Sequence, residues 1–155
     1  MITIHKSPTA DTRTCDVTKV TREQLVDSSR QHIQDVQFGL AYFRQKLTEA
    51  GAAHDCTKLD RMDQFFSDFK TKFEQHTWWD HHQKTERHHL ASPVGVREDV
   101  DLIDVLEFIT DCVMAGMARS GSVYELKLPP EVLEKAFQNT VTKFKAQVVV
   151  AEEKK

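Results

Sequence analysis

Histidine and aspartate, residue types that often bind metal ions, are concentrated in the middle of this chain. The segment from Trp79 to His89 holds four of the chain's eight histidines, in the pairs His81-His82 and His88-His89. The dipeptide His54-Asp55 stands upstream of them. Neutral imidazole and carboxylate are ligands that zinc, iron and manganese accept, and packing gives a chain no reason to group histidines in this way. The grouping therefore predicts a divalent-metal site.

A lysine follows the His-Asp pair at a spacing that suits contact with a phosphate. Lys58 lies three residues after Asp55, in the string His-Asp-Cys-Thr-Lys. Adjacent nitrogen and oxygen ligands can hold one metal ion, or the aspartate can bridge two, while the lysine reaches an anionic oxygen of a bound substrate. The alternative is that Lys58 and Arg61 form only the exposed side of a helix.

Three acidic residues are spaced to share one face of a later helix. Asp104 and Glu107 precede Asp111 by seven and four positions, which places all three on one side at helical periodicity. Asp111 is the only charged residue between Phe108 and Ala118, so burial of this helix would leave its carboxylate in need of a metal, a cation or hydrogen bonds. Asp104 and Glu107 could ligate a metal, orient a ligand or act as a base. A solvent-exposed acidic face is the other interpretation.

Sparse helix-breaking residues and helical spacing of apolar residues indicate an all-α chain. Five glycines and four prolines occur among 155 residues, a length that suits a single domain with one core. We expect residues 1–20 to form a loosely ordered arm and residues 21–155 to form a helical domain. Thr21 and Gln24 are spaced to cap a first helix, which Gly51 is expected to end.

Local signals also place the remaining helices. Helix-capping residues, prolines and glycines mark where each one begins or ends. The expected elements are a second helix opening at Thr57, a short piece over Trp78–His82, a helix from near Asp99 to Arg119 that ends at Gly121, and a last helix from Pro129-Pro130 to the charged tail Glu152–Lys155.

Charge and cysteine content argue against several classes of protein. The formal charge is −3, with 24 acidic against 21 basic residues, and non-specific nucleic-acid binding needs Lys and Arg to neutralise phosphates, so it is not expected. Three widely spaced cysteines offer neither a disulfide framework nor a Cys-x-x-Cys metal clip. No secretory signal and no membrane-spanning apolar stretch is visible. We therefore expect a soluble, cytoplasmic protein without a membrane partner.

The order of these motifs resembles the His…His-Asp…Asp signature of the HD-domain superfamily of metal-dependent phosphohydrolases. A closer likeness is to a family of small HD-like proteins of phages and bacteria, whose pattern is His-Ile-x-x-Val, His-Asp-x-Ser-Lys, His-x5-His-His and Asp-x-x-Glu-x-x-x-Asp. The four motifs begin here at His32, His54, His82 and Asp104, in the same order. This chain has Thr57 in place of the serine, and it lacks the Pro-Glu that follows the histidine pair in that family.

The resemblance implies a single-domain HD-like bundle of about five helices that holds one or two divalent metals and hydrolyses a phosphoester. By that analogy His54, Asp55 and Asp111 would be metal ligands, and His82 with His88 or His89 would serve a second metal. The residue set does not distinguish Mn, Fe, Zn, Co and Mg. The expected partner is a small phosphorylated substrate such as a nucleotide, and a homo-oligomer is compatible with the sequence.

His32 fits this ligand set only if the first helix is interrupted. A continuous helix from His32 to Ala50 is about 27 Å long, and the few loop residues after it cannot return His54 to its start. Either the helix breaks, with Gly39 as the expected place, or His32 belongs to the core or supports a ligand from behind.

The sequence therefore predicts a metal-dependent phosphohydrolase. Lys58, with Arg87 or Arg61 as weaker candidates, would neutralise phosphoryl oxygens, and Glu107 or Asp104 would take or supply a proton. Two other classes fit the same residues. One is a non-catalytic module that keeps a metal and binds a nucleotide or a protein. The other is a different helical enzyme, either a di-iron oxygenase or a nucleoside-triphosphate pyrophosphatase that uses magnesium.

Overall fold

The first helix is long and begins where its capping signal predicts. The computed structural model describes residues 1–151, and the predicted charged tail, residues 152–155, lies outside the described residues. Helix α1 (Arg22–Ala53) opens with a capping box, in which the Thr21 hydroxyl accepts from the Gln24 N–H at 3.2 Å and the Gln24 side chain accepts from the Thr21 N–H at 3.0 Å. The helix passes through Gly51, so the predicted end was wrong by two residues.

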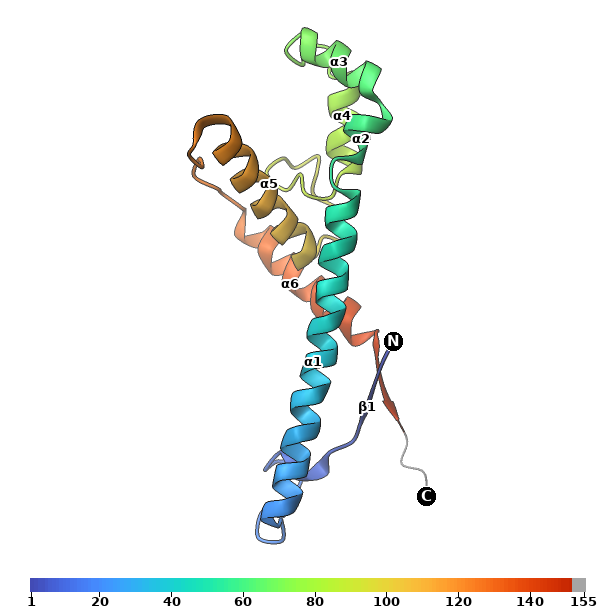
Figure 1. Ribbon diagram of the computed structural model, residues 1–155, viewed down its shortest axis with the longest axis vertical. Helices are drawn as coiled ribbons and strands as arrows, with labels where there is room; N and C mark the ends of the chain where they lie inside the picture. Colours follow the sequence, from blue (N-terminus) through green and yellow to red (C-terminus); the bar gives the residue numbers. More distant parts are fainter. Residues whose placement is uncertain (152–155) are drawn as a thin grey trace. The chain divides into compact units, whose positions relative to one another are not determined.

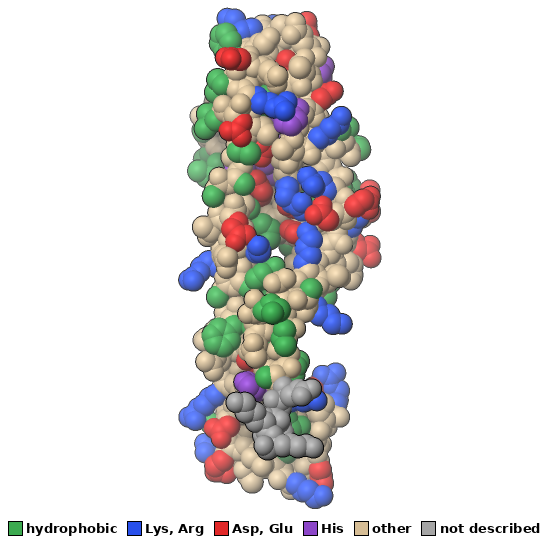
Figure 2. Space-filling view, turned by 90° about the vertical axis from the view of Figure 1, so that its right-hand side faces the viewer, with side chains coloured by type: hydrophobic (Ala, Val, Ile, Leu, Met, Phe, Trp, Pro, Cys, Tyr) green, Lys and Arg blue, Asp and Glu red, His purple; other side chains and the backbone are tan. Residues whose placement is uncertain are grey.

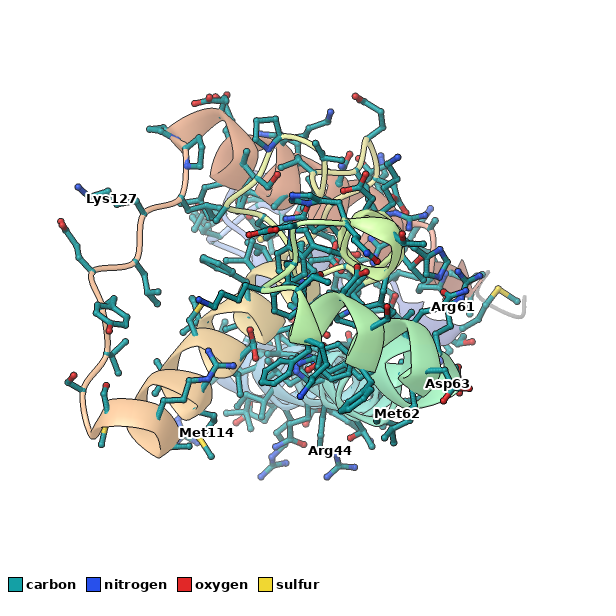
Figure 3. The ribbon with its side chains drawn as sticks, turned by 90° about the horizontal axis from the view of Figure 1, so that it is seen from above. Arg44, Arg61, Met62, Asp63, Met114 and Lys127 are labelled. Carbon is teal, nitrogen blue, oxygen red and sulfur yellow. The ribbon has the colours of Figure 1, made fainter. Side chains whose placement is uncertain are left out.

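The predicted second helix is divided into two at Arg61. Helix α2 (Cys56–Asp60) and helix α3 (Met62–Lys70) meet at this residue, whose φ of −127° and ψ of 41° are not helical. Helix α4 (Thr77–Thr85) follows, and the three short helices contact one another. Figure 3 shows Arg61 at the junction of α2 and α3. The break replaces one long helix by a small cluster of short ones.

Aromatic packing and one buried carboxylate hold α3 against α4. Phe65 of α3 packs on Trp78 of α4 with ring centroids 4.3 Å apart. Asp68, 1% exposed, accepts hydrogen bonds from the backbone N–H groups of Trp78 at 2.7 Å and Trp79 at 3.1 Å. These bonds satisfy two N–H groups in the first turn of α4, which the helix itself leaves without partners. Asp68 therefore fixes the start of the helix that carries His82.

Helices α5 (Leu102–Ser120) and α6 (Pro130–Lys145) enclose the hydrophobic core, and Figure 1 shows them side by side. The predicted stop of α5 at Gly121 is confirmed, because Gly121 adopts the left-handed φ of 71° that caps a helix C-terminus. The start lies later than expected, since Asp101 is the N-terminal cap. The core consists of Leu90, Val100, Val105, Phe108, Val132 and Ala136.

The described chain divides into two compact units. Residues 46–142 form one unit, which contains all of α2 to α5 and most of α6. The other unit holds residues 1–45 and 143–151. In it, strand β1 (Ile2–His5) pairs in parallel with strand β2 (Val148–Ala151), in the register Ile2 to Val148. The fold is mostly helical as predicted, and this small sheet, with the 3-10 turn Pro8–Ala10, was not foreseen.

Large apolar side chains are exposed on several helices. Phe66 and Phe69 of α3 are 59% and 60% exposed, and Phe137 of α6 is 52% exposed. Figure 2 shows such apolar side chains among the charged ones on the surface. Exposed apolar surface is common where a protein receives a partner, and the predicted homo-oligomer stays a prediction. No helix in residues 1–151 is long and apolar enough to cross a membrane.

Candidate metal centre

The turn between α1 and α2 carries the His-Asp pair. His54 follows the last residue of α1, and Asp55 precedes α2 with a left-handed backbone, φ 58° and ψ 18°. Aspartate tolerates this conformation better than most residues because its short side chain can hydrogen-bond locally. The turn leaves 28% of the His54 side chain and 19% of the Asp55 side chain exposed. Both side chains are therefore partly withdrawn from water.

The downstream histidines lie on α4 and directly after it. His82 stands in the last turn of α4, is 1% exposed, and stacks on Trp78 with ring centroids 4.2 Å apart. His88, 2% exposed, and the half-buried His89 follow the end of the helix. Imidazole is seldom buried without a polar partner, so three such rings close together require an explanation.

These side chains form two groups of potential metal ligands. His82, His88 and His89 make one group, and His54, Asp55 and His88 make the other. In each group, one ligand atom from every residue lies within 4.8 Å of the others. The structure thus brings together residues from two separate segments of the sequence, as a metal site requires.

Asp55 belongs to the second group and also faces the first, with one carboxylate oxygen toward His82 and His88 and the other toward His54. Its Oδ1 is 3.4 Å from His82 Nε2 and 3.8 Å from His88 Nε2. Its Oδ2 is 3.5 Å from His54 Nε2 and forms an ion pair with Lys58 Nζ. A carboxylate that faces nitrogen atoms on both sides has the geometry of a bridge between two cations.

Two buried polar atoms in this cluster have no hydrogen-bond partner within residues 1–151. They are Asp55 Oδ1 and His89 Nε2. Burying a polar atom without a partner costs about 1–3 kcal/mol, and more for a charged group, so such atoms are rare. Both belong to metal-binding residue types, and a divalent ion bound to these residues would supply the missing interaction. The residues present therefore fit a metal.

Hydrogen bonds to Nδ1 orient three of the imidazole rings. Glu107 Oε1 lies 2.9 Å from His54 Nδ1 and 3.1 Å from His88 Nδ1, and Thr57 Oγ1 lies 2.6 Å from His82 Nδ1. Because an ionised carboxylate only accepts, the first two rings carry hydrogen on Nδ1 and leave Nε2 to face the cluster. Metal-binding histidines characteristically have such outer partners.

The protonation states of His82 and His89 suit cation binding. Burial, with a contribution from His89, lowers the pKa of His82 to about 4, and burial together with His88 lowers the pKa of His89 to about 4. Both rings are therefore neutral at neutral pH, which is the form that binds metals. Burial raises the pKa of Glu107, but hydrogen bonds with His88 and His54 outweigh it and hold that pKa below its usual value. Glu107 is thus ionised.

Asp111 joins the cluster on the side of His54. Its Oδ1 is 3.6 Å from His54 Nε2, and 31% of its side chain is exposed. The carboxylate is therefore less deeply buried than an apolar helix around it would suggest. It remains within reach of the group formed by His54, Asp55 and His88.

Asp104 and Arg87, which the sequence offered as site residues, pair with each other. Asp104, 2% exposed, accepts from Arg87 Nε at 2.6 Å and Nη2 at 2.8 Å, and also accepts from the Asp101 N–H at the start of α5. Arg87 is held by this pair, and its pKa lies above its usual value because of the hydrogen bonds to Asp104. The pair fastens the loop after α4 to α5, which is a structural role.

His32 is exposed on α1 and lies in the unit that contains residues 1–45. Helix α1 runs without a break through Gly39, so the interruption that His32 would need in order to act as a ligand is not present in it. Its role as a ligand stays a prediction without support from the geometry.

Two residues of the site were not identified from the sequence. Glu86, 6% exposed, accepts from the Thr57 N–H at 2.9 Å and so supports the residue that contacts His82. Gly95 lies so close to His89 that an added Cβ would stand 1.9 Å from the His89 carbonyl oxygen. The signals available were a glutamate next to the histidine segment and a glycine in a proline-containing loop, and neither reveals its contact.

Comparison with known proteins gives no relative from which a role could be transferred. No protein-family model, no curated protein and no solved structure matches this chain. The case for a metal centre therefore rests on the cluster itself: two groups of potential ligands that share His88, with Asp55 facing both.

Proposed function

We propose that this protein is a metal-dependent phosphohydrolase that acts on a small phosphoester. The observation that carries the proposal is the position of Asp55, whose Oδ1 is buried, has no hydrogen-bond partner in the described chain, and faces His82 and His88. Its other oxygen faces His54. A carboxylate shared between two nitrogen-rich groups supports a two-metal centre of the kind that serves phosphoester hydrolysis.

Two ligand sets would hold different ions, with His88 assigned to the first set and Asp111 added to the second. His82, His88 and His89 with Asp55 Oδ1 would hold one, and His54, Asp111 and Asp55 Oδ2 would hold the other. Divalent metals, when bound, lower the pKa of water and polarise phosphoryl oxygens. The second group offers fewer protein ligands and is more exposed, which supports it as the side where a substrate binds.

The chain's own side chains have distinct roles in this proposal. Lys58 has three N–H donors and uses one for Asp55, so the ammonium group can also donate to a phosphoryl oxygen. Glu107 holds the rings of His54 and His88 and is a positioning residue. In the reaction a bond forms between a water oxygen and phosphorus, the ester P–O bond breaks, and the leaving alcohol receives a proton that the water gave up.

Elemental analysis of untagged protein, paired with an assay of phosphate release, tests the proposal. The wild type is expected to hold transition metal near stoichiometry and to release phosphate from a panel of phosphoesters with Mn, Fe, Zn, Co or Mg. Asp55→Ala is expected to lose both properties. Asp60→Ala is the matched control, because Asp60 is an exposed acid at the end of α2, the short helix that Asp55 precedes. Full phosphate release by Asp55→Ala contradicts the proposal.

A non-catalytic metal-binding module is a second candidate. His82, His88, His89 and Asp55 could supply four ligands, enough for a closed structural site, and His82 and His88 are almost fully buried. This candidate predicts one tightly held ion, a large loss of thermal stability on chelation, and no phosphate release with any added metal.

A further inference from the structure

A pocket adjoins the candidate metal centre. It has a volume of about 370 Å³ and lies between the end of α1 and the middle of α5, within residues 46–142. His54, Glu107 and Asp111 form part of its wall, so it shares three residues with the centre. A molecule bound to the metal ligands would therefore extend its remaining part into this pocket.

The rest of the wall is apolar except for Thr110. Leu47 of α1 and Leu106 and Met114 of α5 line the pocket, and they are 41%, 45% and 66% exposed. Figure 3 shows Met114 projecting from α5. Gly51 also lines the pocket, and a Cβ added there would meet no atom within 4 Å. Open apolar surface of this kind favours an apolar ligand group, because binding removes the surface from water.

The polar groups of the wall do not suit a polyphosphate or a nucleobase. Among the described residues that line the pocket there is no Lys or Arg, and its acidic members Glu107 and Asp111 would repel further phosphates. The one neutral hydroxyl there, on Thr110, already donates to the Leu106 carbonyl at 2.8 Å. The ring nitrogens and carbonyl oxygens of a nucleobase would therefore lose water without finding a free hydrogen-bond donor among these side chains.

We propose that the substrate is the phosphate monoester of an apolar alcohol, whose organic group fills this pocket while its phosphate faces the metal ligands and Lys58. The proposal rests on the phosphohydrolase function proposed above and narrows its substrate class. A cavity of about 150 Å³ holds benzene. At about 370 Å³ the pocket has room for a fused two-ring aromatic group or a chain of similar size.

Binding of stable phosphonates tests the pocket without requiring turnover. Protein loaded with manganese is titrated calorimetrically with 1-naphthylphosphonate, methylphosphonate and adenosine monophosphate in its non-hydrolysable phosphonate form. We expect the naphthyl compound to bind about 50-fold more tightly than the methyl compound, from the apolar area that it buries. Adenosine monophosphate is expected to gain less than about fivefold over methylphosphonate, because its base finds few partners.

Filling the pocket gives the matched variant. Gly51→Leu places a larger side chain where the pocket is open, and leucine favours the helix more than glycine does, so the fold is not endangered. It is expected to abolish the naphthyl preference and leave methylphosphonate binding unchanged. Ala52→Leu, on the next and exposed position of α1, is the control that should keep the preference.

The outcomes distinguish a failure of the proposed substrate class from a failure of the proposed reaction. Equal affinity for the two phosphonates, tighter binding of adenosine monophosphate, or a naphthyl preference that survives Gly51→Leu overturns the substrate class. If nucleotides are hydrolysed under the same conditions, the phosphohydrolase function survives that result. A naphthyl preference lost in Gly51→Leu, with no phosphate released from 1-naphthyl phosphate by any metal form, supports the pocket and overturns the proposed reaction.

Discussion

Replacing Glu107 by glutamine should weaken metal binding while leaving every candidate ligand in place. Glu107 Oε1 is the shared partner of His54 Nδ1 at 2.9 Å and of His88 Nδ1 at 3.1 Å. Glutamine keeps an oxygen of similar position but removes the negative charge. The substitution therefore changes the strength of two hydrogen bonds rather than the shape of the site.

The size of the effect follows from those two bonds. A hydrogen bond to a charged group contributes about 1.5–3 kcal/mol and is roughly twice as strong as a neutral one. Halving two such bonds removes about 2 kcal/mol from the metal-bound state, which corresponds to about a 30-fold loss of affinity. Substitutions of outer partners of metal ligands characteristically cost 10- to 100-fold, roughly the same range.

Competition with a coloured chelator measures this affinity for zinc or manganese. Glu125→Gln is the control, because Glu125 is also a glutamate and its side chain is 79% exposed in the segment between α5 and α6. We expect Glu107→Gln to bind about 30-fold more weakly and Glu125→Gln to match the wild type. Equal affinity of all three proteins would refute the role of Glu107 in orienting the histidines.

Three further predictions follow from the surroundings of the site. In metal-free protein, His82 and His89 have folded-state pKa values of about 4, below the unfolded value. Their contribution to stability is therefore complete above about pH 6.5 and is lost as the pH falls toward about 4. Unfolding followed by circular dichroism should show this loss, which is on the order of 3 kcal/mol for His82. Asp104→Asn should lower the free energy of unfolding by about 2 kcal/mol, since it removes the more buried of the two carboxylates that pair with Arg87 and leaves only the more exposed Asp99. Any phosphate release by the folded protein should be kept; loss of phosphate release at unchanged stability, measured by denaturant titration with the phosphate assay, would restore Asp104 as a catalytic residue. Gly95→Ala should displace the His89 backbone, because the added Cβ would stand 1.9 Å from the His89 carbonyl oxygen. Chelator competition should show at least about tenfold weaker metal binding. Unchanged affinity would show that His89 is not a ligand.

Features set by neighbouring residues in the sequence could be predicted. The capping box at Thr21 and the stop at Gly121 depend on a few adjacent residues, and both are present in the structure. The break at Arg61 could not be predicted, because no proline or glycine marks it and α3 packs against α4, which comes later in the chain. Similarly, β1 pairs with a strand at the far end of the sequence, so Val148–Ala151 gives no local sign of its partner.

The candidate site likewise has features that the sequence could predict and features that it could not. The sequence named the residues that the cluster brings together, because ligand types and their order are visible in one dimension. Helical periodicity placed Asp104 and Glu107 on one face. It could not show that Asp104 would pair with Arg87, or that Glu107 would hydrogen-bond to two histidines. That difference depends on the course of the loop after α4, and the contact of Gly95 with His89 depends on it as well.

The left-handed backbone at Asp55 favours glycine for folding, whereas ligand binding requires the aspartate carboxylate. Glycine adopts a φ of 58° without the steric cost that a side chain adds, which is about 1 kcal/mol. Exchange to glycine would therefore favour the bare polypeptide while removing the carboxylate that faces both groups of histidines. Under selection for stability alone, this position should drift to glycine. Retention of aspartate across descendants of this chain would accordingly indicate selection for the carboxylate and not for stability alone.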